Sequence, residues 1–119
     1  MLKNNTEIFE RSDFVATVES DTLKICINGE IDHHSAVATR TEIDAIIFRN
    51  RPKILEMDLS NVGFMDSSGL GLIMGRYSLM NELGGSMVVV DPSLGVERII
   101  RLAGLEKVIR IEKRKRVSK

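Results

Sequence analysis

Apolar and polar residues tend to alternate in the first well-patterned part of the chain. Residues 14–19 (FVATVE) and 22–27 (TLKICI) follow this pattern on either side of the pair Ser20-Asp21. Such alternation around a polar turn predicts a β-hairpin with one buried face. Three further strands are predicted, over residues 53–59, 87–90 and 107–111. The run at 87–90 is continuously apolar, as in strands that are covered on both faces.

Helical spacing of apolar residues predicts three helices between these strands. The expected ranges are about 35–48, from near Ser67 to Leu83, and from the capping segment 91–93 to about 103. Pro52 stops the first helix, and glycines follow the other two. Asn28-Gly29 is expected to form a loop into the first helix, and 60–65 a loop into the second. The predicted fold is α/β, with a mixed, mostly parallel sheet, an N-terminal antiparallel hairpin and three to four packed helices.

Length and charge limit the number of domains and the kinds of partner. The 119 residues suit one domain, and 17 basic against 17 acidic side chains leave no net charge. A dedicated nucleic-acid or membrane-surface binder is usually more basic. Residues 1–12 are polar and aperiodic, which predicts a flexible leader before a domain over 13–112. The basic segment 113–119 predicts a solvated tail.

Cysteine content and hydropathy indicate a cytoplasmic protein. Cys26 is the single cysteine, so it forms no internal disulfide, and its place in an alternating run predicts a small buried apolar side chain. The N-terminus lacks a signal-like segment, and no apolar run is long enough to cross a bilayer.

The stretch FMDSSGLGLIMGRY, residues 64–77, contains the most informative polar residues. Asp66, Ser67 and Ser68 lie between a predicted strand and the long helix, at the sheet edge where α/β domains usually meet ligands and partners. Any of the three side chains could cap the helix by accepting a backbone N–H bond. The sequence alone leaves open whether a serine caps, reacts or is modified.

Other chemistries find little support. Neither serine stands in a G-x-S-x-G motif, and His33 and His34 precede the serines rather than follow them, which argues against an α/β-hydrolase. The glycines after Ser68 lack the spacing of a dinucleotide-binding motif, and no P-loop Lys-Ser or Lys-Thr follows. The two histidines have no neighbouring ligand set for a metal, so a capping or core role is expected.

The long helix has three different sides on a helical wheel. A stripe of mostly small residues could let another backbone approach, or could pack tightly within the domain; it consists of Gly71, Gly75, Ser78 and Glu82. The side expected to face the core carries Leu70, Ile73, Met74, Tyr77 and Met80. An exposed mixed patch suited to a protein interface is expected from Leu72, Arg76 and Leu79.

Two stretches together resemble a known family. GEIDHHSA (29–36) and FMDSSGLGLIMGRY (64–77) are similar to the anti-sigma factor antagonists, which are single STAS domains, and particularly to their sporulation branch. The resemblance extends more weakly through GGSMVVV and RIIRLAGL, over about 22–111. The long leader and the basic tail have no counterpart that can be placed.

The resemblance implies a switch and not an enzyme. Ser67 would be phosphorylated by the cognate anti-sigma factor, a serine kinase that itself binds the ATP and metal, so this chain would need no cofactor. The unphosphorylated form would bind that kinase and free a sporulation sigma factor, and a serine phosphatase would restore it. The predicted partner-binding residues are Asp32, Asp66, Ser67, Ser68, Gly69, Leu72, Arg76 and Leu79. No contact with nucleic acid or membrane is expected.

Three alternatives stay open. The chain could belong to the general-stress antagonists, which use a different sigma factor. It could be a STAS scaffold or ligand-sensing module that is never phosphorylated. An unrecognised enzyme would require a turnover that Ser67→Ala abolishes in the absence of a kinase.

Overall fold

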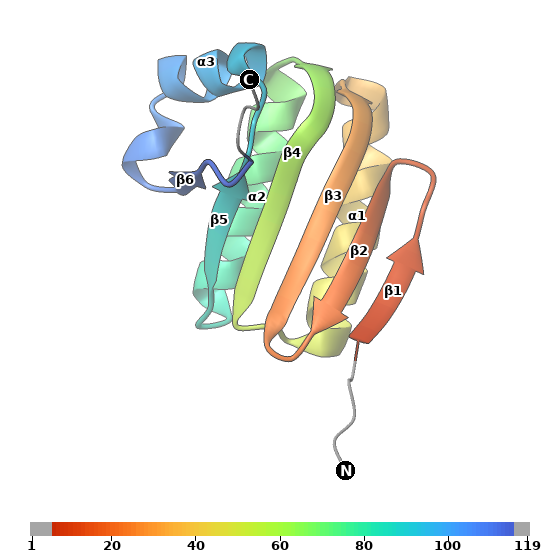
Figure 1. The fold of residues 1–119 in the computed structure, drawn as a ribbon. Coiled ribbons are helices and arrows are strands. Elements are labelled where there is room, and N and C mark those ends of the chain that lie inside the picture. The colour runs from red at the N-terminus through yellow and green to blue at the C-terminus, as the bar shows by residue number, and fades with distance from the viewer. Residues whose placement is uncertain (1–5, 116–119) are drawn as a thin grey trace.

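Six strands form one sheet whose spatial order follows the order of the chain (Figure 1). The computed structural model describes residues 6–115. The strands are β1 (Thr6–Glu10), β2 (Phe14–Glu19), β3 (Thr22–Ile31), β4 (Ile54–Met65), β5 (Ser86–Val90) and β6 (Arg110–Glu112). Strand β2 pairs antiparallel with both β1 and β3, and the strands β3 to β6 are parallel to one another. The predicted fold class, with its opening hairpin and mostly parallel sheet, is confirmed.

Three α-helices connect the parallel strands, as their crossovers require. They are α1 (His33–Asn50), α2 (Ser67–Glu82) and α3 (Leu94–Leu102), and a short 3₁₀ helix, Leu105–Lys107, precedes β6. Helices α1 and α2 lie side by side behind the sheet in Figure 1, while α3 lies near the end of β5. This arrangement buries one face of the sheet beneath α1 and α2.

The core forms where the alternating strands meet these helices. Phe14, Leu23 and Ile25 are fully buried, as the hairpin alternation predicts. Ile43 and Ile47 of α1 are fully buried as well. The same contacts orient α1 and α2, and therefore position the residues at their first turns.

Cys26 departs from the expectation of a buried side chain. It is half-buried, because it points to the opposite face from its neighbours Ile25 and Ile27. Its sulfur accepts a weak hydrogen bond from the Asn61 amide at 3.7 Å. Partial burial raises the pKa of the thiol, and the nearby Asp58 carboxylate raises it further.

Several segments expected to be loops are strands. Part of the expected leader 1–12 forms β1, which pairs with β2; residues 1–5 lie outside the described part of the chain. The expected loops at 28–29 and 60–65 are extensions of β3 and β4 that pair with each other through an irregular register. Gly29 permits this with a φ of 92°, and the side chains of Asn28 and Asn61 join at 3.0 Å. The pairing between strands therefore overrides turn-like local sequence.

The end of the domain also differs from the prediction. Residues 105–107, partly assigned to the last strand, form the 3₁₀ helix, and β6 begins only at Arg110. The basic tail is held against the domain as far as residue 115, because Lys113 lies 2.7 Å from Glu97 and Arg114 forms a two-pronged pair with Glu56 at 3.0 and 3.2 Å. The remaining tail residues, 116–119, lie outside the described part of the chain.

Candidate functional site

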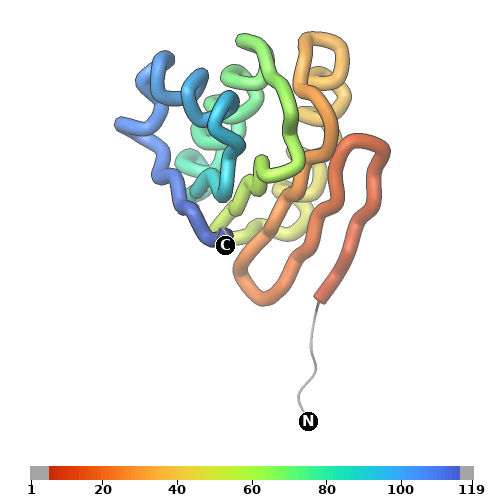
Figure 2. The backbone as a smooth tube through the Cα atoms, turned by 45° about the horizontal axis from the view of Figure 1, so that its top comes forward, coloured from red at the N-terminus to blue at the C-terminus, as the bar shows by residue number. Residues whose placement is uncertain are grey.

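The turns from β3 into α1 and from β4 into α2 lie next to each other at one edge of the sheet. Ile31 and Met65 are paired in register at the ends of these strands. The backbone N–H of Asp66 donates to the carbonyl of Ile31 at 3.1 Å. Figure 2 brings this edge forward and shows the two turns as neighbours. The expectation that Asp32 and Asp66 share one edge is confirmed.

Each of these helices is capped by its aspartate. The Asp66 carboxylate accepts from the Ser68 N–H at 2.7 Å. The Asp32 carboxylate accepts from the Ser35 N–H at 2.9 Å, and the Ser35 hydroxyl accepts from the Asp32 N–H at 3.1 Å. The Ser35 N–H is the main reason that the pKa of Asp32 lies below its ordinary value. The capping function at the second junction therefore belongs to Asp66.

Ser67 is consequently free of the capping role. It is the first residue of α2, and its side chain is exposed. Within residues 6–115 its hydroxyl makes no hydrogen bond. Ser68 differs, because it is half-buried and its side chain lines the groove between α1 and α2. The structure thus presents one of the two serines to solvent at a helix N-terminus.

Gly69 lets α2 start directly against the end of β4. A β-carbon at this position would lie 2.7 Å from the sulfur of Met65 and 2.8 Å from its β-carbon. Both distances are well below van der Waals contact, and Met65 is fully buried. Close packing of strand end and helix start therefore depends on the missing side chain.

A groove of about 240 Å³ runs between the first halves of α1 and α2. His33 and Arg40 line it from α1, and Ser68 and Gly71 from α2. A β-carbon added at Gly71 or Gly75 would meet nothing within 4 Å. Of the two explanations left open for the small-residue stripe, tight packing within the domain is therefore excluded at these positions. The glycines leave the surface of α2 accessible.

The expectation of an exposed patch on α2 is wrong. Leu72 and Arg76 are buried, with 3% and 5% of their surface exposed, and Leu79 is half-buried against the core. The reason is that α1 packs against this side of α2. A helical wheel drawn for one helix cannot show that a second helix covers its flank.

Arg76 is held there by an ion pair with Asp44 of α1. Its Nε lies 2.9 Å from one carboxylate oxygen, and Nη2 donates to the other at 3.4 Å. Burial raises the pKa of Asp44, and the charge of Arg76 only partly opposes this. The pair couples α1 to α2.

The two histidines also differ from the expectation. His33 and His34 occupy the first turn of α1 and are exposed, so they belong neither to the cap nor to the core. Within residues 6–115, no three His, Cys, Asp or Glu side chains lie close enough together to hold a metal ion. His33 instead forms one wall of the groove beside Ser68.

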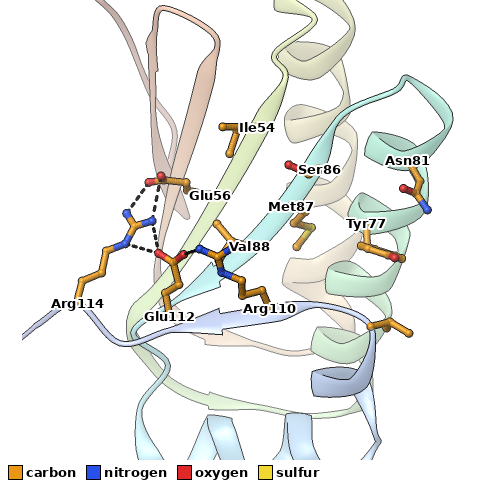
Figure 3. A pocket seen from close by; sticks show the side chains of 11 residues that line it. Ile54, Glu56, Tyr77, Asn81, Ser86, Met87, Val88, Arg110, Glu112 and Arg114 are labelled. Atoms are coloured by element: carbon orange, nitrogen blue, oxygen red, sulfur yellow. Dashed lines mark hydrogen bonds and ion pairs between the residues drawn. The ribbon is translucent and has the colours of Figure 1, made fainter.

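A second cavity, of about 500 Å³, was not indicated by the sequence. It lies beside β5 and β6 and the last turns of α2, at the opposite end of that helix from Ser67 (Figure 3). Its charged groups satisfy one another, since Glu112 bonds both Arg110 and Arg114. This cavity therefore offers no uncompensated charge to a ligand.

Comparison with known proteins gives the family. The sequence profile described as STAS domain matches residues 13–116. The chain belongs to the STAS domain family. Among residues 6–115, no helix of this STAS domain has both the length and the apolar character needed to span a membrane.

Relatives of this STAS domain carry a common description. An anti-sigma F factor antagonist of Paenibacillus polymyxa is 42% identical over 75% of this chain and 76% of its own length. An anti-sigma-B factor antagonist of Bacillus subtilis is 30% identical over 75% of this chain and 80% of its own.

Solved structures share the fold. The unphosphorylated anti-sigma factor antagonist SpoIIAA superposes with a TM-score of 0.72 at 24% identity, covering 92% of this chain and 88% of that one. The phosphorylated form of the Bacillus cell fate determinant SpoIIAA gives a TM-score of 0.66 at 24% identity, with 92% and 91% covered. At this level of identity the likeness concerns the fold.

Proposed function

We propose that this STAS domain is an anti-sigma factor antagonist controlled by phosphorylation of Ser67. The unphosphorylated chain binds an anti-sigma factor that is a serine kinase, and so frees a sporulation sigma factor. Transfer of phosphate to Ser67 ends the binding, and a serine phosphatase reverses it. The chain supplies the substrate hydroxyl, while ATP and metal belong to the kinase, and the exchange takes place in the cytoplasm.

The observation that carries this proposal is the free hydroxyl of Ser67. A serine that caps a helix uses its oxygen for a backbone N–H, but here Asp66 accepts that bond. Ser67 is exposed at the carboxyl edge of the parallel strands, where a kinase active site could reach it. The anti-sigma factor antagonists among its relatives support the assignment.

A phosphate on Ser67 would be tolerated by the fold and rejected by the interface. Phosphorylation adds about −1.5 to −2 charge. The helix dipole favours an anion at the first turn of α2, so no unfolding is required. The same charge adjoins the carboxylate of Asp66 and would meet a partner surface shaped for a neutral hydroxyl. A like-charge clash of this kind can cost several kcal/mol, and each 1.4 kcal/mol weakens binding about tenfold.

The docking surface is proposed to include the exposed or half-exposed groups around Ser67. Asp32, Asp66 and Ser68 contribute polar atoms, and Gly69 allows the helix start to lie close to the strand end. Leu72 and Arg76 are buried, and they support this surface from below without contacting the partner. Leu79, half-buried in the second half of α2, lies beyond the first turns of that helix.

Intact-mass measurement with a candidate anti-sigma kinase and ATP tests the proposal. One phosphate is expected on the unmodified chain and on the Ser68→Ala control, and none on Ser67→Ala. Binding to the kinase, measured by titration calorimetry in the presence of ADP, should disappear after phosphorylation. If a kinase of proven activity adds no mass, the chain is better explained as a STAS scaffold or sensing module that is not phosphorylated.

The general-stress antagonists remain a second candidate, because a relative described as an anti-sigma-B factor antagonist is 30% identical. The chemistry at Ser67 would be the same and the kinase different. Parallel assays with sporulation-type and stress-type anti-sigma kinases distinguish the two, since the cognate kinase should bind more tightly and phosphorylate faster.

A further inference from the structure

The outer face of α3 carries the two most exposed large apolar side chains of the described residues. Leu94 is 82% exposed and Leu102 is 81% exposed. They lie eight residues apart, so they occupy the same side of the helix, separated by about two turns. A shallow groove of about 530 Å³ runs along this side and is also lined by Arg98 and Arg101. We call Leu94, Arg98, Arg101 and Leu102 the α3 face.

The charges on this face are only partly compensated. Glu97 pairs with Arg101 at 2.8 Å and with Lys113 at 2.7 Å, and it is itself largely buried. Arg98 is exposed and has no hydrogen-bond or ion-pair partner within residues 6–115. Gly95 adds open space, because a β-carbon there would meet nothing within 4 Å. The α3 face therefore presents a free guanidinium between two apolar contacts.

The start of α3 is attached to the strand that leads to Ser67. The hydroxyl of Ser93, which caps α3, donates to the carbonyl of Val62 in β4 at 3.4 Å. Val62 lies three residues before the end of β4. Phe64 lies between Val62 and that end, and its side chain is 50% exposed. Figure 1 shows α3 at the end of the sheet where β4 turns into α2. The α3 face thus begins at the end of the sheet where β4 leads into α2.

We infer that the α3 face is a second part of the docking surface for the anti-sigma partner, and that it receives an amphipathic segment with apolar side chains on either side of a carboxylate. This inference rests on the proposed function. The apolar side chains would cover Leu94 and Leu102, and the carboxylate would form a two-pronged pair with Arg98.

A membrane fits this face less well. Helices that bind membrane surfaces have larger apolar faces and several free cations. Here the helix has nine residues, and Arg98 is its one cation without a partner in residues 6–115. A protein segment can cover two leucines and pair one guanidinium within so small an area.

The test compares the affinity of the cognate anti-sigma kinase for four chains: unmodified, Leu94→Ser/Leu102→Ser, Arg98→Glu and Phe48→Ser. Phe48 is a matched control, because it is 50% exposed but lies in the last turns of α1, at the opposite end from the Ser67 edge. The double leucine variant should bind about tenfold more weakly or worse. Arg98→Glu should bind about three- to tenfold more weakly, with a smaller effect at high salt.

A kinetic readout separates docking from chemistry. Phosphorylation of Ser67 in the α3 variants should show a raised KM and an unchanged kcat, since the hydroxyl and the first turn of α2 are untouched. Circular dichroism and urea midpoints check that each variant is folded, as expected for substitutions at exposed positions.

Each outcome decides the matter. Full-strength binding by both α3 variants, with the kinase still phosphorylating Ser67, overturns this inference and leaves the proposed function intact. A kinase that neither binds nor phosphorylates the unmodified chain overturns both. Cosedimentation with phosphatidylglycerol vesicles that depends on the two leucines, with kinase affinity unchanged, would overturn the protein partner in favour of a membrane.

Discussion

The clearest test of how the site is built compares three glycines of one helix. Gly69, Gly71 and Gly75 all belong to α2, but only the first faces a crowded environment. An alanine at Gly69 would place its β-carbon 2.7–2.9 Å from three atoms of Met65. One of them is the Met65 β-carbon, which cannot move without its backbone. Gly69→Ala must therefore shift the start of α2 away from the end of β4.

The expected loss of stability follows from two opposing effects. Overpacking in a dense core costs about 1–3 kcal/mol. Replacing glycine by alanine inside a helix stabilises the folded state by about 0.5–1 kcal/mol. The gain is smaller near the helix N-terminus. Gly69→Ala should therefore lower the free energy of unfolding by about 1–2 kcal/mol.

Gly71→Ala and Gly75→Ala are the matched controls. Their new β-carbons meet nothing within 4 Å, so only the helix-propensity effect remains. Each should raise the free energy of unfolding by about 0.5–1 kcal/mol. Gly71 also lines the groove beside Ser68, so its alanine variant should fold better while binding the kinase more weakly.

Urea unfolding followed by circular dichroism measures these differences. With a slope of about 1–2 kcal/mol per molar urea, Gly69→Ala should lower the midpoint by about 0.5–2 M, and the controls should raise it slightly. Phosphorylation of Ser67 should slow in Gly69→Ala, because the hydroxyl moves with the first turn. Equal midpoints for Gly69→Ala and Gly71→Ala would refute the close contact with Met65.

Other substitutions test the caps and the ion pair by the same unfolding measurement. Asp66→Ala should cost about 1 kcal/mol through loss of the cap, while Asp66→Asn should retain most of it; equal losses would contradict the capping role. Arg76→Met should cost about 1–3 kcal/mol by leaving Asp44 unpaired, and adding Asp44→Leu should restore stability to within about 1 kcal/mol; additive losses would show that the pair is not coupled. The pKa of Asp32 is lowered from 3.8, so its stabilising effect is complete above that pH and is lost as the pH falls through the lower folded value. The difference in free energy of unfolding between the unmodified chain and Asp32→Asn should therefore shrink as the pH is lowered. A difference that grows on acidification would contradict a lowered pKa for Asp32.

Local sequence patterns were sufficient to predict most helices and strands of the fold. The alternation in β2 and β3 arises because successive side chains of a strand point to opposite faces. This two-residue period is a local property of the strand and does not depend on the rest of the chain. The ends of α1 and α2 were likewise indicated by local signals, namely Pro52 after the first and the glycines after the second. The order of strands and helices then implied a mostly parallel sheet.

Long-range pairing decided what local patterns could not show. Asn28-Gly29 and residues 60–65 look like turns when read alone, yet each supplies the hydrogen-bonding partner of the other as β3 and β4 extend. Strand β1 is similarly stabilised by pairing with β2 and not by any strong pattern of its own. These errors arose because strand formation is a property of two segments at once.

For the candidate site, too, some features followed from the sequence and others only from the tertiary structure. The sequence alone indicated that Asp66, Ser67 and Ser68 start a helix at the carboxyl edge of the sheet and that one of them caps it, because capping and edge position follow from local chemistry and element order. Tertiary structure decided that Asp66 caps and leaves Ser67 free, since hydrogen-bond geometry selects one oxygen among three neighbours. It also decided that Leu72 and Arg76 are buried and that Leu94 and Leu102 are not, because the packing of other elements determines which side of a helix remains in contact with water.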